Sequence, residues 1–181
     1  MAQTTMFGRM VKCYNLPHNE IKDLNDKYEE NKNKLNSMAP RLAGRLESEL
    51  EFTELLQSTD IFKSITKCMS DYIDTCEQVG LYNQNFKKEG HKNLHDLTGW
   101  STVLFLKIPE FINDAPETAQ QKYKDGKLGF IGHDGVTCQY MEPQVGHFYI
   151  FEARHQHCVM PFKTKVKGDF RRSMSFNFII N

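Results

Sequence analysis

The sequence predicts a mainly β domain that is braced by helices in its N-terminal part. Helical periodicity is strong before Gly80, whereas short β-favouring runs separated by Gly, Pro, Asn and Asp follow it. A chain of 181 residues is long enough for one well-buried core and too short for two ordinary domains. We therefore expect a single domain, with a helical support region over about residues 1–85 and a β core over about residues 86–181.

Two stretches predict the helices. Residues 19–35 carry a thin apolar stripe at helical spacing among many charges, and Asn19 is a candidate cap. Residues 60–80 carry a broader apolar stripe, with Gly80 at its end as a stop signal. The broad stripe predicts that this second helix packs against a sheet.

Five β-favouring runs predict strands at Thr102–Ile108, Lys127–Ile131, Gly146–Phe151, Cys158–Phe162 and Ser173–Ile180. Short strands at such close spacing favour a barrel or a sandwich. The stretch Pro109–Asp125 has two prolines and a polar middle, which predicts a long surface loop and a candidate substrate lid. The pair His133-Asp134 between two glycines indicates a hairpin turn more simply than a metal or phosphate loop.

The composition excludes several classes of function. Lys and Arg number 23 against 23 Asp and Glu, so the basic surface of a nucleic-acid or anionic-membrane binder is not expected. No stretch is long and apolar enough for a signal peptide or a membrane span. Five widely spaced cysteines without a CxxC pair are typical of a reducing compartment. We expect a cytoplasmic protein, monomeric or homodimeric, that acts on a small-molecule or protein substrate.

Two histidines are candidate metal ligands. His157 lies between two apolar runs, where its side chain can point into a barrel, and His95 directly precedes the apolar run 100–108. A histidine at a strand end is more often a surface or hydrogen-bonded residue. Two histidines on facing strands together with a carboxylate, however, would form the facial triad of non-haem Fe(II) oxygenases.

The last strand combines a cation with hydroxyl groups. Alternation places two sets of side chains on opposite faces: Arg171, Ser173, Ser175 and Asn177 on one, and Arg172, Met174 and Phe176 on the other. An inward Arg171 with an inward Ser173 can hold a carboxylate through a charge-assisted contact and a hydroxyl. The alternative is that the two arginines form only the solvated start of a strand.

The order of these elements resembles a known family. The segment 143–177 carries Pro143, Gly146, His157 and then RRSMSFN, and the segment NLHDLTGWSTVLFLKIPEF at 93–111 precedes it. Both are similar to the 2-oxoglutarate/Fe(II)-dependent oxygenases of marine bacteriophages, the prolyl-4-hydroxylase-like group. The resemblance extends into the N-terminal helices and is most specific in the C-terminal half.

The resemblance implies a double-stranded β-helix, of the jelly-roll or cupin-like type, with iron between its two sheets. It implies that His95 and His157 bind Fe(II), and that Arg171 with Ser173 holds the distal carboxylate of 2-oxoglutarate. Ascorbate is an optional further cofactor. The implied reaction is decarboxylation of 2-oxoglutarate to succinate and CO2, coupled to hydroxylation of an unidentified substrate.

One position departs from the family pattern. The third metal ligand is expected two residues after His95, where this chain has Leu97. Asp96 or His91 are alternative ligands, and water or no ligand are the others. A small residue at this position makes room for chloride in related halogenases, and Leu97 is too bulky for that. The remaining alternatives are an impaired protein that serves as a binding or viral assembly module, and a cupin-like metal protein that uses no 2-oxoglutarate.

Overall fold

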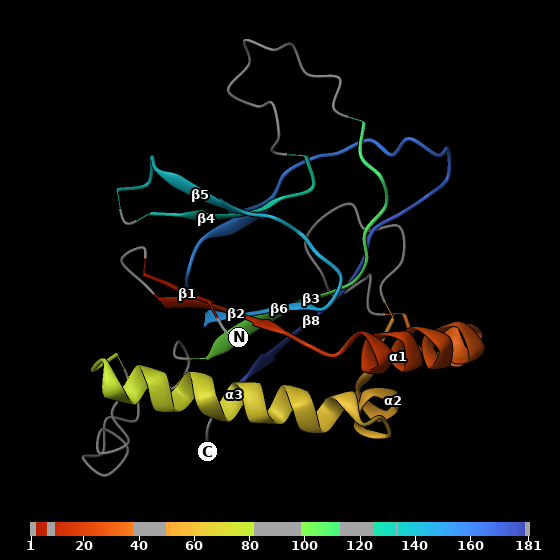
Figure 1. Ribbon diagram of the computed structural model, residues 1–181, viewed down its shortest axis with the longest axis horizontal. Helices are drawn as coiled ribbons and strands as arrows, with labels where there is room; N and C mark the ends of the chain where they lie inside the picture. The colour runs from red at the N-terminus through yellow and green to blue at the C-terminus, as the bar shows by residue number, and fades with distance from the viewer. Residues whose placement is uncertain are drawn as a thin grey trace.

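Two antiparallel sheets face each other in the molecule, and helices cover the far side of the larger sheet (Figure 1). The computed structural model describes residues 3–6, 10–37, 50–81, 99–112, 125–132 and 134–179. Within these residues the larger sheet has five strands in the order β1-β2-β6-β3-β8, and the smaller has three in the order β5-β4-β7.

The strands of the larger sheet are β1 (Gln3–Met6), β2 (Met10–Asn15), β6 (His147–Glu152), β3 (Trp100–Lys107) and β8 (Arg172–Phe178). Those of the smaller sheet are β5 (Cys138–Met141), β4 (Leu128–Ile131) and β7 (His157–Val159). All five strands predicted from the sequence are confirmed, with shifted ends. The strand predicted to reach Phe162 stops at Val159, shortly before Pro161, which cannot donate a ladder hydrogen bond.

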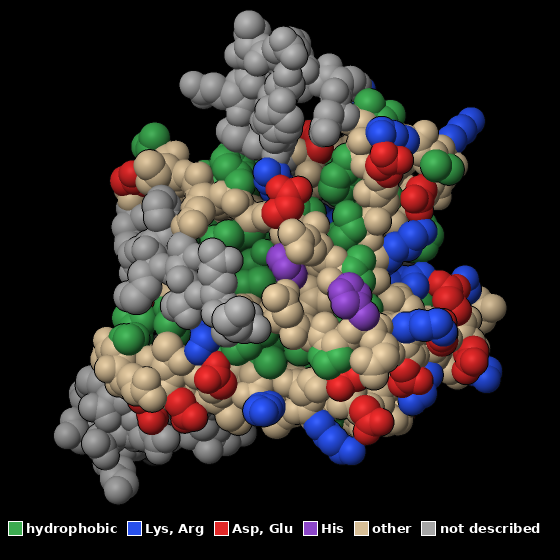
Figure 2. Space-filling model, viewed as in Figure 1, with side chains coloured by type: hydrophobic (Ala, Val, Ile, Leu, Met, Phe, Trp, Pro, Cys, Tyr) green, Lys and Arg blue, Asp and Glu red, His purple; other side chains and the backbone are tan. Residues whose placement is uncertain are grey.

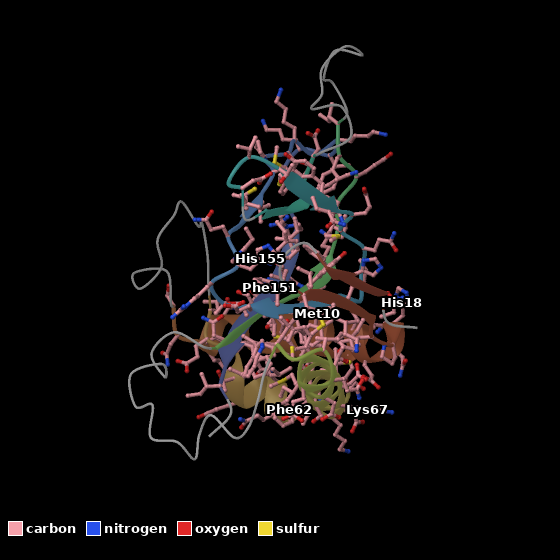
Figure 3. All side chains as sticks on the ribbon, turned by 90° about the vertical axis from the view of Figure 1, so that its left-hand side faces the viewer. Met10, His18, Phe62, Lys67, Phe151 and His155 are labelled. Carbon is pink, nitrogen blue, oxygen red and sulfur yellow. The ribbon has the colours of Figure 1, made fainter. Side chains whose placement is uncertain are left out.

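The larger sheet is buried on both faces because its side chains alternate between two cores. In β6, Phe148 and Ile150 belong to the core beneath the helices, which we call the helix-side core. Tyr149 and Phe151 belong to the core between the two sheets, which we call the inter-sheet core. Figure 3 shows Phe151 on the side of the smaller sheet and Met10 on the side of the helices.

The helical layer consists of α1 (His18–Asn31), η1 (Lys32–Lys34), α2 (Thr53–Gln57) and α3 (Ile61–Gln78). Helix α3 runs along the larger sheet, as its broad apolar stripe predicts, and it buries Ile61, Ile65, Tyr72 and Cys76 there. The Tyr72 hydroxyl donates to the backbone carbonyl of Met10 at 3.0 Å. This contact ties α3 to the start of β2.

The two helix ends behave differently from each other. Helix α3 stops at Gly80, which has a φ of 73° and is followed by a hydrogen bond from the Leu81 N–H to the Cys76 carbonyl at 2.8 Å. This is a Schellman motif, and the predicted stop is confirmed. The predicted cap of the first helix is wrong, because Pro17 occupies the N-cap and Asn19 lies inside the first turn.

The N-terminal region contains strands that the sequence does not predict. The region of about residues 1–85, expected to be helical, includes β1 and β2, and β2 pairs with β6 in the middle of the larger sheet. In β2, Val11 contributes to the inter-sheet core while Met10 and Tyr14 contribute to the helix-side core. The alternation is masked in the sequence because a charged Lys12 occupies one of the buried positions.

The predicted hairpin is also present between β4 and β5. The Asp134 carboxylate accepts hydrogen bonds from the N–H groups of Val136 and Thr137, and Gly135 has a φ of 70°. His133 lies outside the described residues, as do residues 113–124 of the loop predicted over 109–125. The start of that loop is held by a β-bridge between Phe111 and Thr164. None of the described helices is long and apolar enough to cross a membrane.

Lys12 and Asp71 yield a testable prediction about stability. Lys12 is only 7% exposed and donates to Asp71 at 2.6 Å, and Tyr14 donates to the same carboxylate at 2.8 Å. The hydrogen bond from Lys12 holds the pKa of Asp71 below its usual value. A carboxylate with a lowered folded-state pKa stabilises the fold above its unfolded pKa, and this contribution is lost as pH falls through the lowered value.

We therefore expect Asp71→Asn to lower the free energy of unfolding by about 1 kcal/mol at pH 7, because solvent screens the half-exposed carboxylate. The difference from the unchanged protein should shrink as pH falls from about 5. Urea unfolding at several pH values measures both effects. Asp74→Asn, which changes an exposed carboxylate on the same helix, is the matched control. A difference that does not depend on pH would contradict the role given to Asp71.

Candidate functional site

The candidate site lies in the space between the two sheets. Its apolar part is the inter-sheet core, which is formed by Val11, Phe105, Leu128, Phe130, Tyr149 and Phe151. Figure 2 shows apolar side chains at the surface between the sheets, while acidic and basic side chains gather over the helices. Polar groups of β7 and β8 border this apolar core.

His157 faces the larger sheet from β7. It is the register partner of Phe130, and both side chains therefore share the inner face of the smaller sheet. Its ring packs edge-on against Phe151, with the ring centroids 4.8 Å apart. His157 is nevertheless exposed, so its ring can be reached from solvent. The prediction that this side chain points between the sheets is confirmed.

A backbone contact orients the His157 ring. Its Nδ1 lies 2.8 Å from the carbonyl oxygen of His155. A carbonyl only accepts, so Nδ1 carries the proton and Nε2 of the neutral ring keeps its lone pair. His155 is itself buried, and its Nε2 lies 3.2 Å from the carbonyl of Ile131. A backbone-oriented imidazole with an available Nε2 is the usual arrangement of a metal-binding histidine.

Arg171 lies at the other border of the inter-sheet core, immediately before β8. Its guanidinium carbon is 5.5 Å from the ring centroid of Phe105 and 5.4 Å from that of Phe162. It donates one hydrogen bond to the carbonyl of Gly126 at 3.0 Å. Burial lowers the pKa of Arg171, although a guanidinium remains charged in proteins. A cation between two rings is suited to binding an anion.

The inner face of β8 is polar, as the alternation predicts. Ser173 pairs with Phe105, Ser175 with Val103, and Asn177 with Ser101. Because Phe105 and Val103 pack in the inter-sheet core, their partners on β8 face the same space. The Ser101 hydroxyl donates to Oδ1 of Asn177 at 2.7 Å. The space between the sheets therefore has an aromatic interior and a row of hydroxyl and amide groups along β8.

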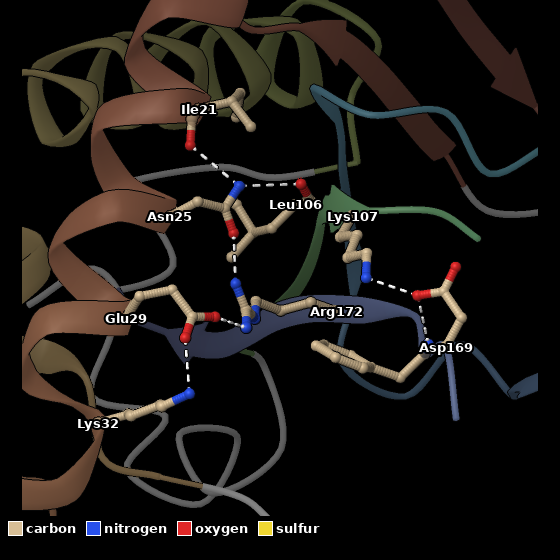
Figure 4. Close-up of polar contacts among 9 residues, drawn as sticks. Ile21, Asn25, Glu29, Lys32, Leu106, Lys107, Asp169 and Arg172 are labelled. Atoms are coloured by element: carbon tan, nitrogen blue, oxygen red, sulfur yellow. Dashed lines mark hydrogen bonds and ion pairs between the residues drawn. The ribbon is translucent and has the colours of Figure 1, made fainter. Parts of the chain in front are cut away.

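The opposite face of β8 is anchored to α1. Arg172 donates to Oδ1 of Asn25 at 2.8 Å, forms an ion pair with Glu29, and lies over the ring of Tyr28 (Figure 4). Its backbone neighbour Lys107 binds Asp169 at 2.5 Å. These contacts hold Arg172 on the helix side of the sheet.

Successive side chains of a strand point in opposite directions. The anchoring of Arg172 toward α1 therefore directs Arg171 toward the inter-sheet core. Arg172 is a positioning residue for Arg171, and the sequence alternation predicts its face but not its partners.

Several residues at the site were not predicted from the sequence. Tyr149 donates to the carbonyl of Glu142 at 3.3 Å, and Nδ1 of His147 lies 3.3 Å from the Tyr149 hydroxyl. Burial raises the pKa of Tyr149 and lowers the pKa of His147. The alternation of His147, Tyr149 and Phe151 along one apolar run is the signal that could have identified them.

The second predicted metal ligand cannot be placed. His95 lies outside the described residues, together with the alternatives Asp96 and His91 and the departure at Leu97. Within the described ranges, no group of three or more His, Cys, Asp or Glu side chains could hold a metal ion. The described part of the site thus contributes one imidazole, and further protein ligands would have to come from outside it.

The comparison with protein families identifies the class of protein. Residues 82–177 match the model of the family described as "Putative 2OG-Fe(II) oxygenase", in which 2OG stands for 2-oxoglutarate. The match covers more than half of the chain, and the chain therefore belongs to this family. No curated protein matches the sequence.

The structure is similar to that of a prolyl-4-hydroxylase from Pseudomonas putida. The TM-score is 0.51 at 15% sequence identity, and the match covers 95% of this chain and 91% of the hydroxylase chain. At this identity the similarity concerns the fold: a mainly β architecture with few helices, like that of a prolyl hydroxylase.

The anchor of β8 yields a second prediction. We expect Arg172→Ala to lower the free energy of unfolding by about 1–2 kcal/mol, because it removes the hydrogen bond to Asn25 and the contact with the Tyr28 ring. Lys63→Ala, which breaks the exposed ion pair with Asp60, is the matched control and should leave stability unchanged. Urea unfolding at neutral pH measures both. Equal effects of the two substitutions would contradict the anchoring role.

Proposed function

We propose that this protein is a 2-oxoglutarate- and Fe(II)-dependent dioxygenase that hydroxylates its substrate and releases succinate and CO2. Family membership supports the cofactor and the cosubstrate. The observation that carries the proposal is that His157 and Arg171 border the same inter-sheet core from opposing sheets. A metal-binding nitrogen and an anion-binding guanidinium are the two groups that this chemistry needs side by side.

The described residues fit these two ligands. Nε2 of His157 would bind Fe(II), with His95 as the proposed second ligand. The Arg171 guanidinium and the Ser173 hydroxyl would hold the distal carboxylate of 2-oxoglutarate. Bound iron and 2-oxoglutarate would supply the oxidising chemistry, and ascorbate is an optional reductant.

The aromatic surroundings strengthen the proposed carboxylate contact. Phe105 and Phe162 flank the Arg171 guanidinium and exclude water from its sides. A charge-assisted hydrogen bond is stronger where water is excluded, because the effective dielectric constant falls. The hydrogen bond to Gly126 fixes one nitrogen of the guanidinium and leaves its planar fork oriented.

The proposed architecture is the double-stranded β-helix of the jelly-roll type, to which the two facing antiparallel sheets correspond. The third iron ligand is open between Asp96, His91 and water, because Leu97 occupies the expected position. This departure supports the second candidate function, a catalytically impaired protein that keeps the fold as a binding or viral assembly module.

The finer assignments are proposals as well. The motifs of the C-terminal half support membership of the marine-bacteriophage group, and the balanced charge supports a cytoplasmic protein with a small-molecule or protein substrate. The similarity to a prolyl-4-hydroxylase makes prolyl peptides the first substrates to test.

Anaerobic titration with Fe(II) and 2-oxoglutarate tests the proposal. The unchanged protein should develop the weak visible charge-transfer band of chelated 2-oxoglutarate and should form iron-dependent succinate when O2 is admitted. We expect His157→Ala to abolish the band. We expect Arg171→Ala to raise the concentration of 2-oxoglutarate required about 10–100-fold, since a hydrogen bond to a charged group contributes about 1.5–3 kcal/mol.

His18→Ala and Arg154→Ala change an exposed histidine and an exposed arginine and serve as matched controls. A band without succinate would support the impaired binding module. Metal binding and turnover that survive Arg171→Ala would support the cupin-like alternative. If no band forms and His157→Ala changes nothing, the proposed function is wrong.

A further inference from the structure

Two cysteines lie together on the outer face of the smaller sheet. Cys138 belongs to β5 and Cys158 to β7, and these strands flank β4 on its two sides. Gly129 lies between them in β4, paired with Cys158 on one side and with Tyr140 on the other. The outer face of β4 is opposite to the face that carries Phe130, the register partner of His157.

The absence of a side chain at Gly129 brings the two sulfur atoms together. A Cβ atom at this position would lie 2.9 Å from Sγ of Cys138 and 3.1 Å from Sγ of Cys158. Both sulfurs thus occupy the space above one glycine, and the two thiols are hydrogen-bonded to each other. The ring of Tyr140 borders the same space, with Cε1 3.3 Å from the same point. Cys158 is exposed, so the pair can be reached from solvent.

The geometry disfavours a disulfide and suits a metal ion. Strands on either side of a third strand are about 9.5 Å apart, whereas a disulfide requires Cα atoms within about 7 Å. Both cysteines are free thiols. A metal–thiolate bond of about 2.3 Å lets one ion bridge two sulfurs that are about 4.6 Å apart. A bridging ion therefore joins the two side chains without moving the strands.

We propose that Cys138 and Cys158 bind one Cu(I) ion between their sulfur atoms. Thiolates are soft ligands that select Cu(I), zinc and iron–sulfur clusters. Zinc takes four ligands in structural sites, and the part of the chain that the structure describes has no group of three or more ligands. Cu(I) is satisfied by two thiolates. Both thiols release their protons to solvent on binding, and the ion keeps its oxidation state.

A bound ion would stabilise the sheet that carries His157. It would link β5 to β7 across β4, which otherwise depends on the backbone ladders of three short strands. A ligand that binds only the folded state raises its stability. The proposal is independent of the proposed oxygenase activity, because the sulfurs and the inter-sheet core lie on opposite faces of β4.

Anaerobic competition with a chromophoric Cu(I) chelator tests the proposal on the full chain. We expect one tightly bound Cu(I) per chain and a higher thermal unfolding temperature after one equivalent is added. Cys138→Ser and Cys158→Ser should each weaken binding at least 100-fold and remove the thermal shift. Gly129→Ala keeps both thiols but places a methyl group between them, and it should also weaken binding.

Cys68→Ser, which removes a half-buried thiol on α3, is the matched control and should bind Cu(I) like the unchanged protein. His157→Ala should do the same, which distinguishes this site from the proposed iron site. Circular dichroism verifies the fold of each variant, and Cys158→Ser changes an exposed side chain that the fold tolerates. Unchanged Cu(I) affinity in Cys158→Ser, the absence of a thermal shift in the unchanged protein, or tighter binding of Zn(II) would each overturn the proposal.

Discussion

The larger sheet is buried on both faces, and the rest of the structure depends on this constraint. Each of its central strands must supply apolar side chains to the helix-side core and to the inter-sheet core at alternate positions. In β6, Phe148 and Ile150 are fully buried on one side and Phe151 on the other. A slip of one residue would exchange the two sets, so the register is strongly specified. That register determines which side chains of β3 and β8 reach the site.

The adjacent pair Arg171 and Arg172 shows how the site depends on this register. Two neighbouring cations would ordinarily both remain in solvent. Here Arg172 is bound to α1 through Asn25 and Glu29, and Arg171 lies between Phe105 and Phe162 at the inter-sheet core. The helical layer thus does more than cover the sheet, because it holds the strand from which the proposed carboxylate contact extends.

The smaller sheet has distinct chemistry on its two faces. Its inner face presents His157, oriented by the carbonyl of His155, and its outer face presents the thiols of Cys138 and Cys158 above Gly129. These features arise because adjacent residues of β7 point in opposite directions. The three strands are short, so a ligand on either face would add to the stability of a sheet with few ladder hydrogen bonds.

The sequence by itself determined the features that depend on local pattern. Strand positions in the C-terminal half, helix α3 with its stop at Gly80, the polar inner face of β8 and the family resemblance all follow from side chains that are close together in the chain. The ligand His95 was predicted in the same way and lies outside the described residues. Only the tertiary structure decided the pairing of β2 with β6, the partners of Arg172 and the meeting of Cys138 with Cys158. These depend on contacts between distant segments, which no local periodicity encodes.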